Sequence, residues 1–431
     1  MRLPFWKQKA THAAASAKSM LFPMMAARAM AQNYSAYAVE GYAQNPITFA
    51  CIEKIALAMQ SVDLTLYRIK GGERVKIEGD HPLLALLNRP NPTTSGREFL
   101  AAMARYWMIG GNSYLYGVNV DALKPRSAPP KELYLLQPNH VTIKENPGGQ
   151  FPLAYEYRPG NSSATTYPVN ALTGKSAVLH LKTFDPLDKW RGMPPLMAAA
   201  FAADVFNAGQ KWNLSLLQNG AQPSGALMLK TTDGGSKELS EDQYRRLKQT
   251  IEEQYSGGAN AGRPMLLEGG LEWKEMSQTA KDMDHEKNML NNARWIASVY
   301  GVPPMLVNIP GESTYSNFEQ AQQALWTESV LPKLSMILDA LNIWLAPMFG
   351  DGLEIWYDEE MIPALEPLRK QKADRVNAAS YMTINEKRRA MGLDDADAGD
   401  VILVPAGNVP LELAGSMDLP EPGSPAAAAA V

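Results

Sequence analysis

Three consecutive residues, Gly174-Lys175-Ser176, have the composition of the end of a phosphate-binding P-loop. That motif holds phosphates with the backbone N–H groups of a glycine-rich loop and with the lysine, at the N-terminus of the helix that follows. The glycine required five residues before Gly174 is replaced by Val169, and the pattern after Ser176 predicts a strand rather than a helix. We therefore predict a turn here and no nucleotide site.

A cluster of acidic residues and one histidine, at Asp282, Asp284, His285 and Glu286, has side chains that can ligate a metal ion. On a helix only residues three or four apart share a face, which leaves Asp282 with His285 or with Glu286. Because a zinc site needs three or four protein ligands, the cluster predicts a solvated helix face. The chain has five histidines, none in a recognisable catalytic triad. We therefore expect no catalytic residue, no metal, no cofactor and no enzyme activity.

The composition of the chain is typical of a globular protein and excludes several classes of site. Its 431 residues, 45% of them hydrophobic, indicate several structural units. The formal net charge of -4 disfavours tight binding to a phosphate backbone, which requires clustered positive charge. The single cysteine, Cys51, excludes an intramolecular disulfide, and its apolar neighbours predict a small core residue. No apolar run reaches the roughly 18 residues of a membrane-spanning helix.

The N-terminal segment, residues 1–40, is basic and rich in alanine, and no acidic residue precedes Glu40. This composition resembles that of a transit peptide, and Ala29-Met30-Ala31 resembles a signal-peptidase site. A proline and an arginine interrupt the apolar stretch before that site. We predict a flexible basic arm, with a cleavable targeting segment as the alternative. At the other end, residues 411–431 are rich in Pro, Gly and Ala, which predicts a disordered tail.

Helices and strands alternate over the next part of the chain, which predicts an α+β fold. His81-Pro82 and Ser95, with Glu98 three residues later, are start signals of two helices. The predicted helices cover 46–59, 82–88 and 95–109. The predicted strands cover 62–69, 74–77, 114–120, 132–136, 141–144, 153–158 and 177–184.

Two long helices flank a compact insert in the middle of the chain. The first begins near Pro194 and runs to about residue 219, and the second covers about 279–300. The insert between them is predicted as a small α/β unit that the two helices carry at their tip. Its predicted elements are strands at 226–230, 264–267 and 271–276, a helix at 240–255 and a glycine-rich loop at 257–262.

A polar loop, 308–316, separates the second long helix from the longest predicted helix, which runs from Asn317 to about Met348. Pro332 lies inside this last helix. Because proline removes an intrahelical hydrogen bond and clashes with the preceding turn, we predict a kink there. A strand at 353–357 and helices at 363–380 and 385–391 complete the ordered chain.

A series of short motifs follows one another along the chain. They are His81-Pro82-Leu83-Leu84, Leu87-Asn88-Arg89-Pro90-Asn91-Pro92, Gly111-Asn112-Ser113-Tyr114, Tyr167-Pro168-Val169-Asn170, Val178-Leu179-His180-Leu181, Gly192-Met193-Pro194-Pro195-Leu196, Tyr300-Gly301-Val302-Pro303-Pro304, Thr314-Tyr315-Ser316-Asn317 with Glu319, Pro332, Asn385-Glu386-Lys387-Arg388, Gly392-Leu393 and Val401-Ile402-Leu403-Val404-Pro405. Each motif is weak alone, but their order and spacing from about 46 to 405 resemble the portal proteins of tailed bacteriophages. The resemblance is closest to the long-tailed phage class.

This resemblance implies a ring, usually of twelve subunits, at one vertex of the capsid. Subunits of the family have a wing, a stem of two long helices, a clip and a crown. The basic arm, 1–40, matches no motif of the family. The rest of the sequence maps as a wing at 41–193, a stem helix at 194–219, a clip at 220–277, a second stem helix at 278–300, a tunnel loop at 301–316, a long kinked helix at 317–349, a return strand of the wing at 350–362 and a crown at 363–410.

The resemblance also implies a tunnel loop that projects towards DNA. Duplex DNA carries about one negative charge per 1.7 Å of axis, so a channel that bound each phosphate with Lys or Arg would hold the duplex rather than pass it. The loop instead has short uncharged polar groups and one carboxylate. The expected channel residues are Asn308, Glu312, Ser313, Thr314, Tyr315, Ser316 and Asn317. The expected partner-binding residues of the clip are Gly257, Gly258, Asn260 and Arg263.

We therefore expect a non-enzymatic portal subunit, through whose ring duplex DNA is packaged and ejected. The expected location is the capsid vertex of the virion, and the host cytoplasm during assembly. The expected partners are the packaging motor (terminase), head–tail adaptors, capsid and scaffold proteins, weakly and sequence-independently bound duplex DNA, and further copies of the chain in a dodecamer. Two alternatives stay open: a targeted structural protein with a cleavable N-terminal segment, and an enzyme of unrecognised type.

Overall fold

The computed structural model describes residues 33–121, 128–218, 225–229, 240–242, 244–246, 248–249, 271–275, 285–311 and 315–402. These residues belong to two compact units, one that ends at Met361 and one that begins at Ile362. The first unit combines helices with three-stranded sheets, so the predicted α+β fold is confirmed. No helix within the described residues is long and apolar enough to span a membrane.

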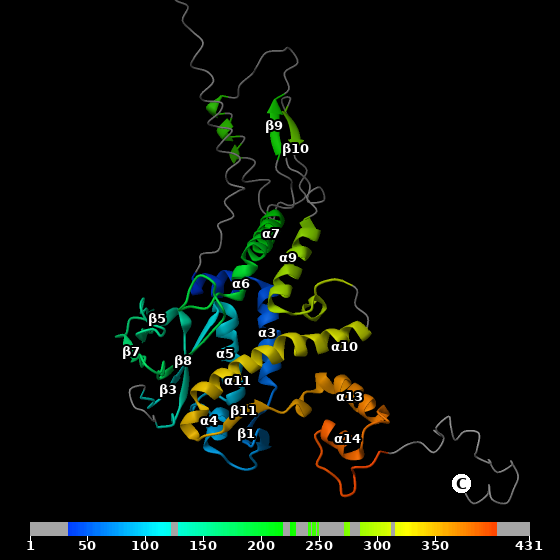
Figure 1. Cartoon of the computed structure of the whole chain (residues 1–431). Helices are drawn as coiled ribbons and strands as arrows, with labels where there is room; N and C mark the ends of the chain where they lie inside the picture. Colours follow the sequence, from blue (N-terminus) through cyan, green and yellow to red (C-terminus); the bar gives the residue numbers. More distant parts are fainter. Residues whose placement is uncertain are drawn as a thin grey trace, which may run out of the picture. The chain divides into compact units, whose positions relative to one another are not determined.

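Three helices pack together in the first unit: α3 (Pro46–Gln60), α5 (Gly96–Gly110) and α9 (His285–Tyr300) (Figure 1). The α3 helix begins where Asn45 Oδ1 accepts hydrogen bonds from the backbone N–H groups of residues 47 and 48, at 3.1 and 2.9 Å. Ser95 Oγ accepts the N–H of Glu98 at 3.3 Å, which confirms the predicted start of α5. His81 caps the short helix α4 (Pro82–Asn88) in the same way.

The side chain of Cys51 lies in this helical core. Ile52, Ile55 and Met59 of the same helix are likewise inaccessible to solvent. Burial raises the pKa of the Cys51 thiol to about 12, so the thiol stays protonated and unreactive at neutral pH. The prediction of a small core residue is confirmed.

Three antiparallel sheets of three strands each are present in the described part of the first unit. The first has the order β11 (Leu353–Tyr357), β1 (Leu64–Lys70), β2 (Glu73–Lys76). The second has the order β4 (Leu133–Leu136), β3 (Asn112–Gly117), β8 (Val178–Lys182). The third has the order β5 (Val141–Lys144), β6 (Ala154–Tyr157), β7 (Thr165–Pro168). Short 3₁₀ turns are found at Pro138–His140 (η2), Pro304–Val307 (η4) and Glu359–Met361 (η6).

One apolar cluster joins the second and third sheets. Its buried members are Tyr114, Leu136, Ile143, Tyr155 and Val178. The sequence predicted every strand of these two sheets except β7. That strand lies at the edge of its sheet and its side chains are mostly exposed, so it has no buried face to give the sequence an alternating pattern.

Two long helices, α7 (Ala200–Gln218) and α9, lie side by side (Figure 1). A short helix, α6 (Pro195–Ala198), precedes α7, so the predicted first long helix is interrupted at Ala199. Beyond the helices, β9 (Gly225–Leu229) pairs with β10 (Leu271–Glu275) in an antiparallel ladder. The predicted strand at 264–267, the glycine-rich loop at 257–262, and with it Gly257, Gly258, Asn260 and Arg263, lie outside the described residues.

The longest predicted helix is continuous but changes type along its length. It consists of α10 (Tyr315–Ala324), a π-helical segment η5 (Leu325–Val330) and α11 (Leu331–Trp344), followed by the short α12 (Ala346–Phe349). Pro332 is the second residue of α11, directly after the π-helical segment. Because proline has no N–H, the change of hydrogen-bond pattern beside it accommodates it within the helix. The kink at Pro332 stays a prediction.

The end of the predicted basic arm differs from expectation. Residues 33–40, which we predicted as flexible, lie in two helical segments, α2 (Tyr34–Ala36) and the π-helix η1 (Tyr37–Ala43). The Tyr34 ring fills the space above Gly110, where a Cβ would lie only 2.4 Å from it, and Tyr37 is buried. These aromatic contacts fix the segment. Residues 1–32 lie outside the described part.

The second unit is small and helical within residues 362–402. It contains the 3₁₀ turn η7 (Pro363–Leu365) and the helices α13 (Glu366–Ala378) and α14 (Ile384–Ala390). A capping box starts α14: Glu386 N–H donates to Thr383 Oγ1, and Thr383 N–H donates to Glu386 Oε2. Buried Asn385 donates to Asp400 Oδ1 at 3.0 Å and thereby holds the following loop against the helix. The assignment of this unit as a crown stays a prediction.

Gly111, at the end of α5, provides a test of close packing. Its φ is +70°, and a Cβ there would lie 2.5 Å from the backbone of Met193. We expect Gly111→Ala to lower the free energy of unfolding by about 3 kcal/mol, because the positive φ and the backbone clash both become unfavourable. Gly160→Ala is the matched control, since Gly160 has a φ of +56° but open space around it, and should cost about 1 kcal/mol. Urea denaturation measures both, and equal losses would contradict the close approach.

Candidate functional site

The segment between α9 and α10 begins with a sharp turn. Gly301 has a φ of +70°, and Pro303 leads into the 3₁₀ turn η4. Asn308 then adopts a left-handed conformation with a φ of 57°, which asparagine tolerates better than most residues. The buried side chains of Leu306 and Ile309 anchor the segment, whereas Asn308 itself is exposed.

The predicted channel residues fall into three groups. Asn308 lies on this exposed turn. Tyr315, Ser316 and Asn317 form the first turn of α10, so the helix begins two residues earlier than predicted and the loop is shorter. Glu312, Ser313 and Thr314 lie outside the described residues. The contact of these residues with DNA stays a prediction.

Arg294 connects this loop to α9. Its guanidinium donates a hydrogen bond to the carbonyl oxygen of Pro310 at 2.8 Å. The position of the loop is therefore coupled to α9, although sixteen residues separate the two partners. This role could not be predicted from the sequence, because an arginine on a predicted helix face has the same pattern whether it is solvated or bonded to a loop.

A second polar cluster joins the end of α9 to the π-helical segment. The carbonyl oxygen of Tyr300 accepts hydrogen bonds from Ser329 Oγ at 2.9 Å and from Lys333 Nζ at 3.1 Å. Lys333 Nζ also donates to Ser329 Oγ at 2.6 Å. Ser329 is fully buried, and burial lowers the pKa of Lys333 to about 8. Through its bond to Tyr300 O, the ammonium group of Lys333 faces the carbonyl end of α9, where positive charge is favourable.

Large apolar side chains are exposed on the two long helices. Phe201 on α7 is 81% exposed, and Trp295 on α9 is 66% exposed. Trp295 borders a hollow of about 760 Å³, which Arg294, Gly301, Pro304 and Glu328 also line. An aromatic side chain exposed beside a hollow offers a place where a protein partner can bury apolar surface.

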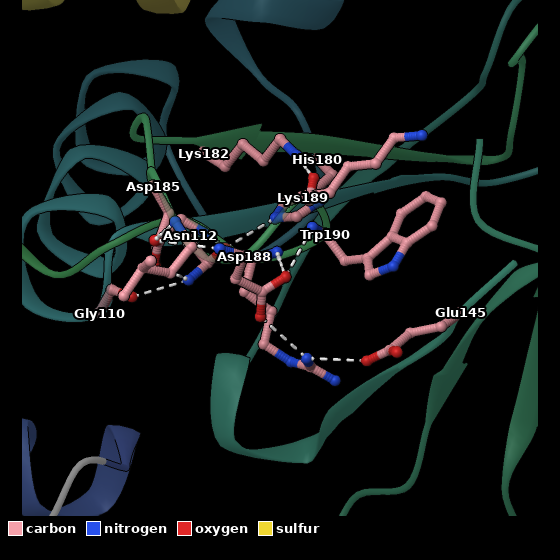
Figure 2. Close-up of polar contacts among 12 residues, drawn as sticks. Gly110, Asn112, Glu145, His180, Lys182, Asp185, Asp188, Lys189 and Trp190 are labelled. Atoms are coloured by element: carbon pink, nitrogen blue, oxygen red, sulfur yellow. Dashed lines mark hydrogen bonds and ion pairs between the residues drawn. The ribbon is translucent and has the colours of Figure 1, made fainter. Parts of the chain in front are cut away.

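The loop between β8 and α6 is held by a polar network, which Figure 2 shows around Asn112. Asn112 Nδ2 donates to the carbonyl oxygens of Gly110 and Gly192, at 2.8 and 3.0 Å. Asn112 Oδ1 accepts the N–H of Gly192 at 2.7 Å and lies 2.9 Å from His180 Nε2. Since Oδ1 can only accept, His180 carries its proton on Nε2. The network fixes the start of the segment that leads into α6 and α7.

His180 is a partly buried titratable group of this network. Its ring stacks on Tyr114, with centroids 4.4 Å apart. Burial, together with the nearby charges of Lys182 and Arg191, lowers the pKa of His180 to about 3. The imidazole is therefore neutral at physiological pH, which suits a fixed structural donor.

Of the other motifs with possible chemistry, the one at 174–176 has a structural explanation. Gly174 has a φ of +69° and its N–H donates to Asn170 O at 2.8 Å, so the predicted turn at Gly174-Lys175-Ser176 is confirmed. Across the residues that the structure describes, no group of three or more His, Cys, Asp or Glu side chains could hold a metal ion. Asp282 and Asp284 lie outside those residues.

Lys333 gives a testable pH dependence. Its pKa in the folded protein is about 8, below its ordinary value of 10.5. Between these pH values the unfolded chain binds more protons, so the free energy of unfolding should rise with pH by up to about 1.4 kcal/mol per unit. Lys333→Met removes this rise. Denaturation of both proteins at pH 7 to 10 measures it, and parallel pH profiles would show that Lys333 is solvated.

His180 should have its effect at acid pH. Because its folded pKa of about 3 lies below its ordinary value of 6.5, the unfolded chain binds more protons in this range. Stability should therefore be lost as the pH falls from 6.5 towards 3, by up to about 1.4 kcal/mol per unit from this group. His180→Gln keeps a donor for Asn112 but cannot titrate. Its pH profile between 7 and 4 should be flatter than that of the natural protein; an equally steep profile would contradict the burial.

Comparison with known proteins gives a consistent relationship. The family model described as "Phage portal protein" matches residues 46–392. An uncharacterized protein of Rickettsia bellii is 37% identical over 364 residues, which is 84% of this chain and 90% of that protein. The portal protein of Enterobacteria phage HK97 is 24% identical over 371 residues, 84% of this chain and 81% of the phage protein.

Solved structures are similar as well. A chain in the neck of a native gene transfer agent particle, computed with C12 symmetry, has 35% identity and a TM-score of 0.62, and the match covers 86% of this chain and 98% of that one. An HK97-family phage portal protein from Corynebacterium diphtheriae, with 14% identity, a TM-score of 0.50 and coverage of 76% and 95%, shares the fold. The sequence match over most of the chain shows that this protein belongs to the phage portal protein family.

Proposed function

We propose that the protein is a portal subunit, one copy of a ring through which duplex DNA enters and leaves a capsid. The observation that carries this proposal is the family match over residues 46–392, together with 35% identity to a chain in the C12-symmetric neck of a gene transfer agent particle. The role of such a ring is structural rather than enzymatic. Its place would be the capsid vertex of the virion, after assembly in the host cytoplasm.

The exposed apolar side chains support assembly into a ring. Phe201 and Trp295 lie on two different helices, α7 and α9, and would contribute to the two different surfaces with which a copy meets its two neighbours. A heterologous contact of this kind closes into a ring when the rotation between copies is right. We expect twelve copies and a buried area above about 2,000 Å² per contact, as in obligate assemblies.

The chemistry of the loop between α9 and α10 supports a channel for DNA. Residues 308–316 contain no Lys or Arg. The cations next to the loop, Arg294 and Lys333, donate to the backbone carbonyls of Pro310 and Tyr300. Because these two cations already bond to the protein backbone, they are less available to bind DNA phosphates. A duplex in the channel would therefore make weak, sequence-independent contacts. The kink proposed at Pro332 would orient α10 and this loop towards the channel.

The segment at 220–277 would be the clip, with Gly257, Gly258, Asn260 and Arg263 in contact with the packaging motor and later with the head–tail adaptors. Capsid and scaffold proteins would contact the outside of the ring. The mass of the purified full chain is the first test, since a portal subunit gives a ring of about twelve copies. A monomer or a small symmetric oligomer at all concentrations would contradict the proposal.

Glu312 provides a test of the channel itself. Glu312→Lys in every copy would place a ring of positive charge against the duplex, so DNA packaging into proheads should slow or stall while ring assembly is unchanged. Glu78→Lys makes the same change of charge on an exposed residue after β2 and is the matched control. Packaging rates of proheads built with each variant decide the point: undiminished packaging with Glu312→Lys would assign the channel to another segment.

A further inference from the structure

The loop between β8 and α6 contains two Asx turns in series. Asp185 Oδ1 accepts the N–H groups of Leu187 and Asp188, at 2.8 and 3.1 Å. Asp188 Oδ1 then accepts the N–H groups of Trp190 and Arg191, at 2.7 and 3.1 Å. Side-chain caps of this kind fix the backbone without a helix or a sheet. We refer to residues 183–191 as the braced loop.

Further bonds tie the braced loop to the sheets beside it (Figure 2). Lys182 Nζ donates to the carbonyl oxygen of Lys189, which closes the loop on itself. Lys189 Nζ donates to Gly149 O at 2.8 Å, and Arg191 pairs with Glu145 at 2.9 Å. Thr183 N–H donates to Gly111 O at 2.9 Å. The charged groups of the loop are therefore engaged within the same subunit.

Two large apolar side chains on this loop nevertheless point into solvent. Phe184 is 83% exposed and Leu187 is 94% exposed. Exposed apolar surface is unfavourable in water, and a mobile loop could turn such side chains inward. Here the Asx turns hold them outward. A side chain held in advance in its bound position loses little conformational entropy on binding, which favours a role as a contact residue.

We infer that Phe184 and Leu187 are anchor residues of the contact between neighbouring copies, and this inference rests on the proposed ring. A second copy fits better than other occupants for two reasons. The braced loop continues through Gly192 into α6 and α7, so a short stretch of chain joins it to Phe201, one of the side chains assigned to the proposed ring contact. The charged side chains of the loop already have hydrogen-bond or ion-pair partners within the same subunit, so an apolar protein surface suits it better than a nucleic acid does.

The geometry of a closed ring adds one requirement. Neighbours in a ring contact each other through two different patches, so Leu187 of one copy should meet a patch on the next copy that does not contain Leu187. This distinguishes a ring contact from a two-fold dimer, in which equivalent loops could meet.

Photo-crosslinking tests the inference directly. Cys51 is fully buried, so Leu187→Cys in the full chain adds a single accessible thiol that takes up benzophenone maleimide. Irradiation of the assembled protein should give inter-chain adducts, and mass spectrometry should map them to a patch other than the braced loop. Leu172→Cys, at a side chain that is 92% exposed, controls for exposure alone and should give at least fivefold less adduct. The absence of inter-chain adducts, adducts between equivalent loops only, or equal yields from both positions would each overturn the inference.

A second measurement is independent of labelling. The double variant Phe184→Ser with Leu187→Ser should weaken assembly, so that rings dissociate at a protein concentration at least tenfold higher than for the natural chain. Leu172→Ser should leave assembly unchanged, and circular dichroism verifies that each variant folds. If the natural chain forms rings and the double variant assembles equally well, the inference fails while the proposed function stands. If the natural chain forms no ring, the proposed function fails.

Discussion

The backbone carbonyl of Tyr300 joins the end of α9 to the long helix that contains the π-helical segment. It lies at the C-terminal end of α9, where helix carbonyls have no partner within the helix and carry partial negative charge. Ser329 and Lys333 supply the missing hydrogen bonds. The ring of Tyr300 is buried, and its hydroxyl donates to Met108 O of α5 at 3.4 Å. One residue thus connects α5, α9 and the long helix that contains the π-helical segment.

This arrangement separates a fixed frame from a variable segment. The helix end at Tyr300 and the start of α11 are tied by buried and partly buried hydrogen bonds, whereas Asn308, Pro310 and Gly311 are exposed. In a π-helical segment each N–H pairs with the carbonyl five residues earlier, instead of four as in an α-helix. Such segments are frequent at functional sites. It lies between the fixed frame and α10, so changes in its pairing would alter the course of α10 while the core stays in place.

Much of the fold could be predicted because its signals are local. The helix starts at His81 and Ser95 are set by neighbouring residues in the chain, and the predicted bounds of β5 and β11 agree with the structure. The segment that follows residue 32 was missed because its order depends on distant contacts, such as that of Tyr34 with Gly110. Lys333 has the same explanation: next to Pro332 in a helix it resembles a solvated lysine, and its partly buried position against the carbonyl of Tyr300 depends on a contact 33 positions away in the chain.

The pairing of β11 with β1 also has a consequence for how the chain is made. Glu354 of β11 forms an ion pair at 2.6 Å with Arg74 of β2, 280 positions earlier, and β11 provides the neighbour of β1 on its other side. A ribosome adds about 5–20 residues per second, so β1 and β2 emerge tens of seconds before the strand that completes their sheet. During that interval one edge of β1 presents unpaired N–H and C=O groups, which can pair with any other nascent chain. Nascent subunits on one messenger RNA are therefore most prone to associate through this edge before residue 357 has been synthesised. A chain truncated before this strand would keep the unpaired edge of β1 permanently.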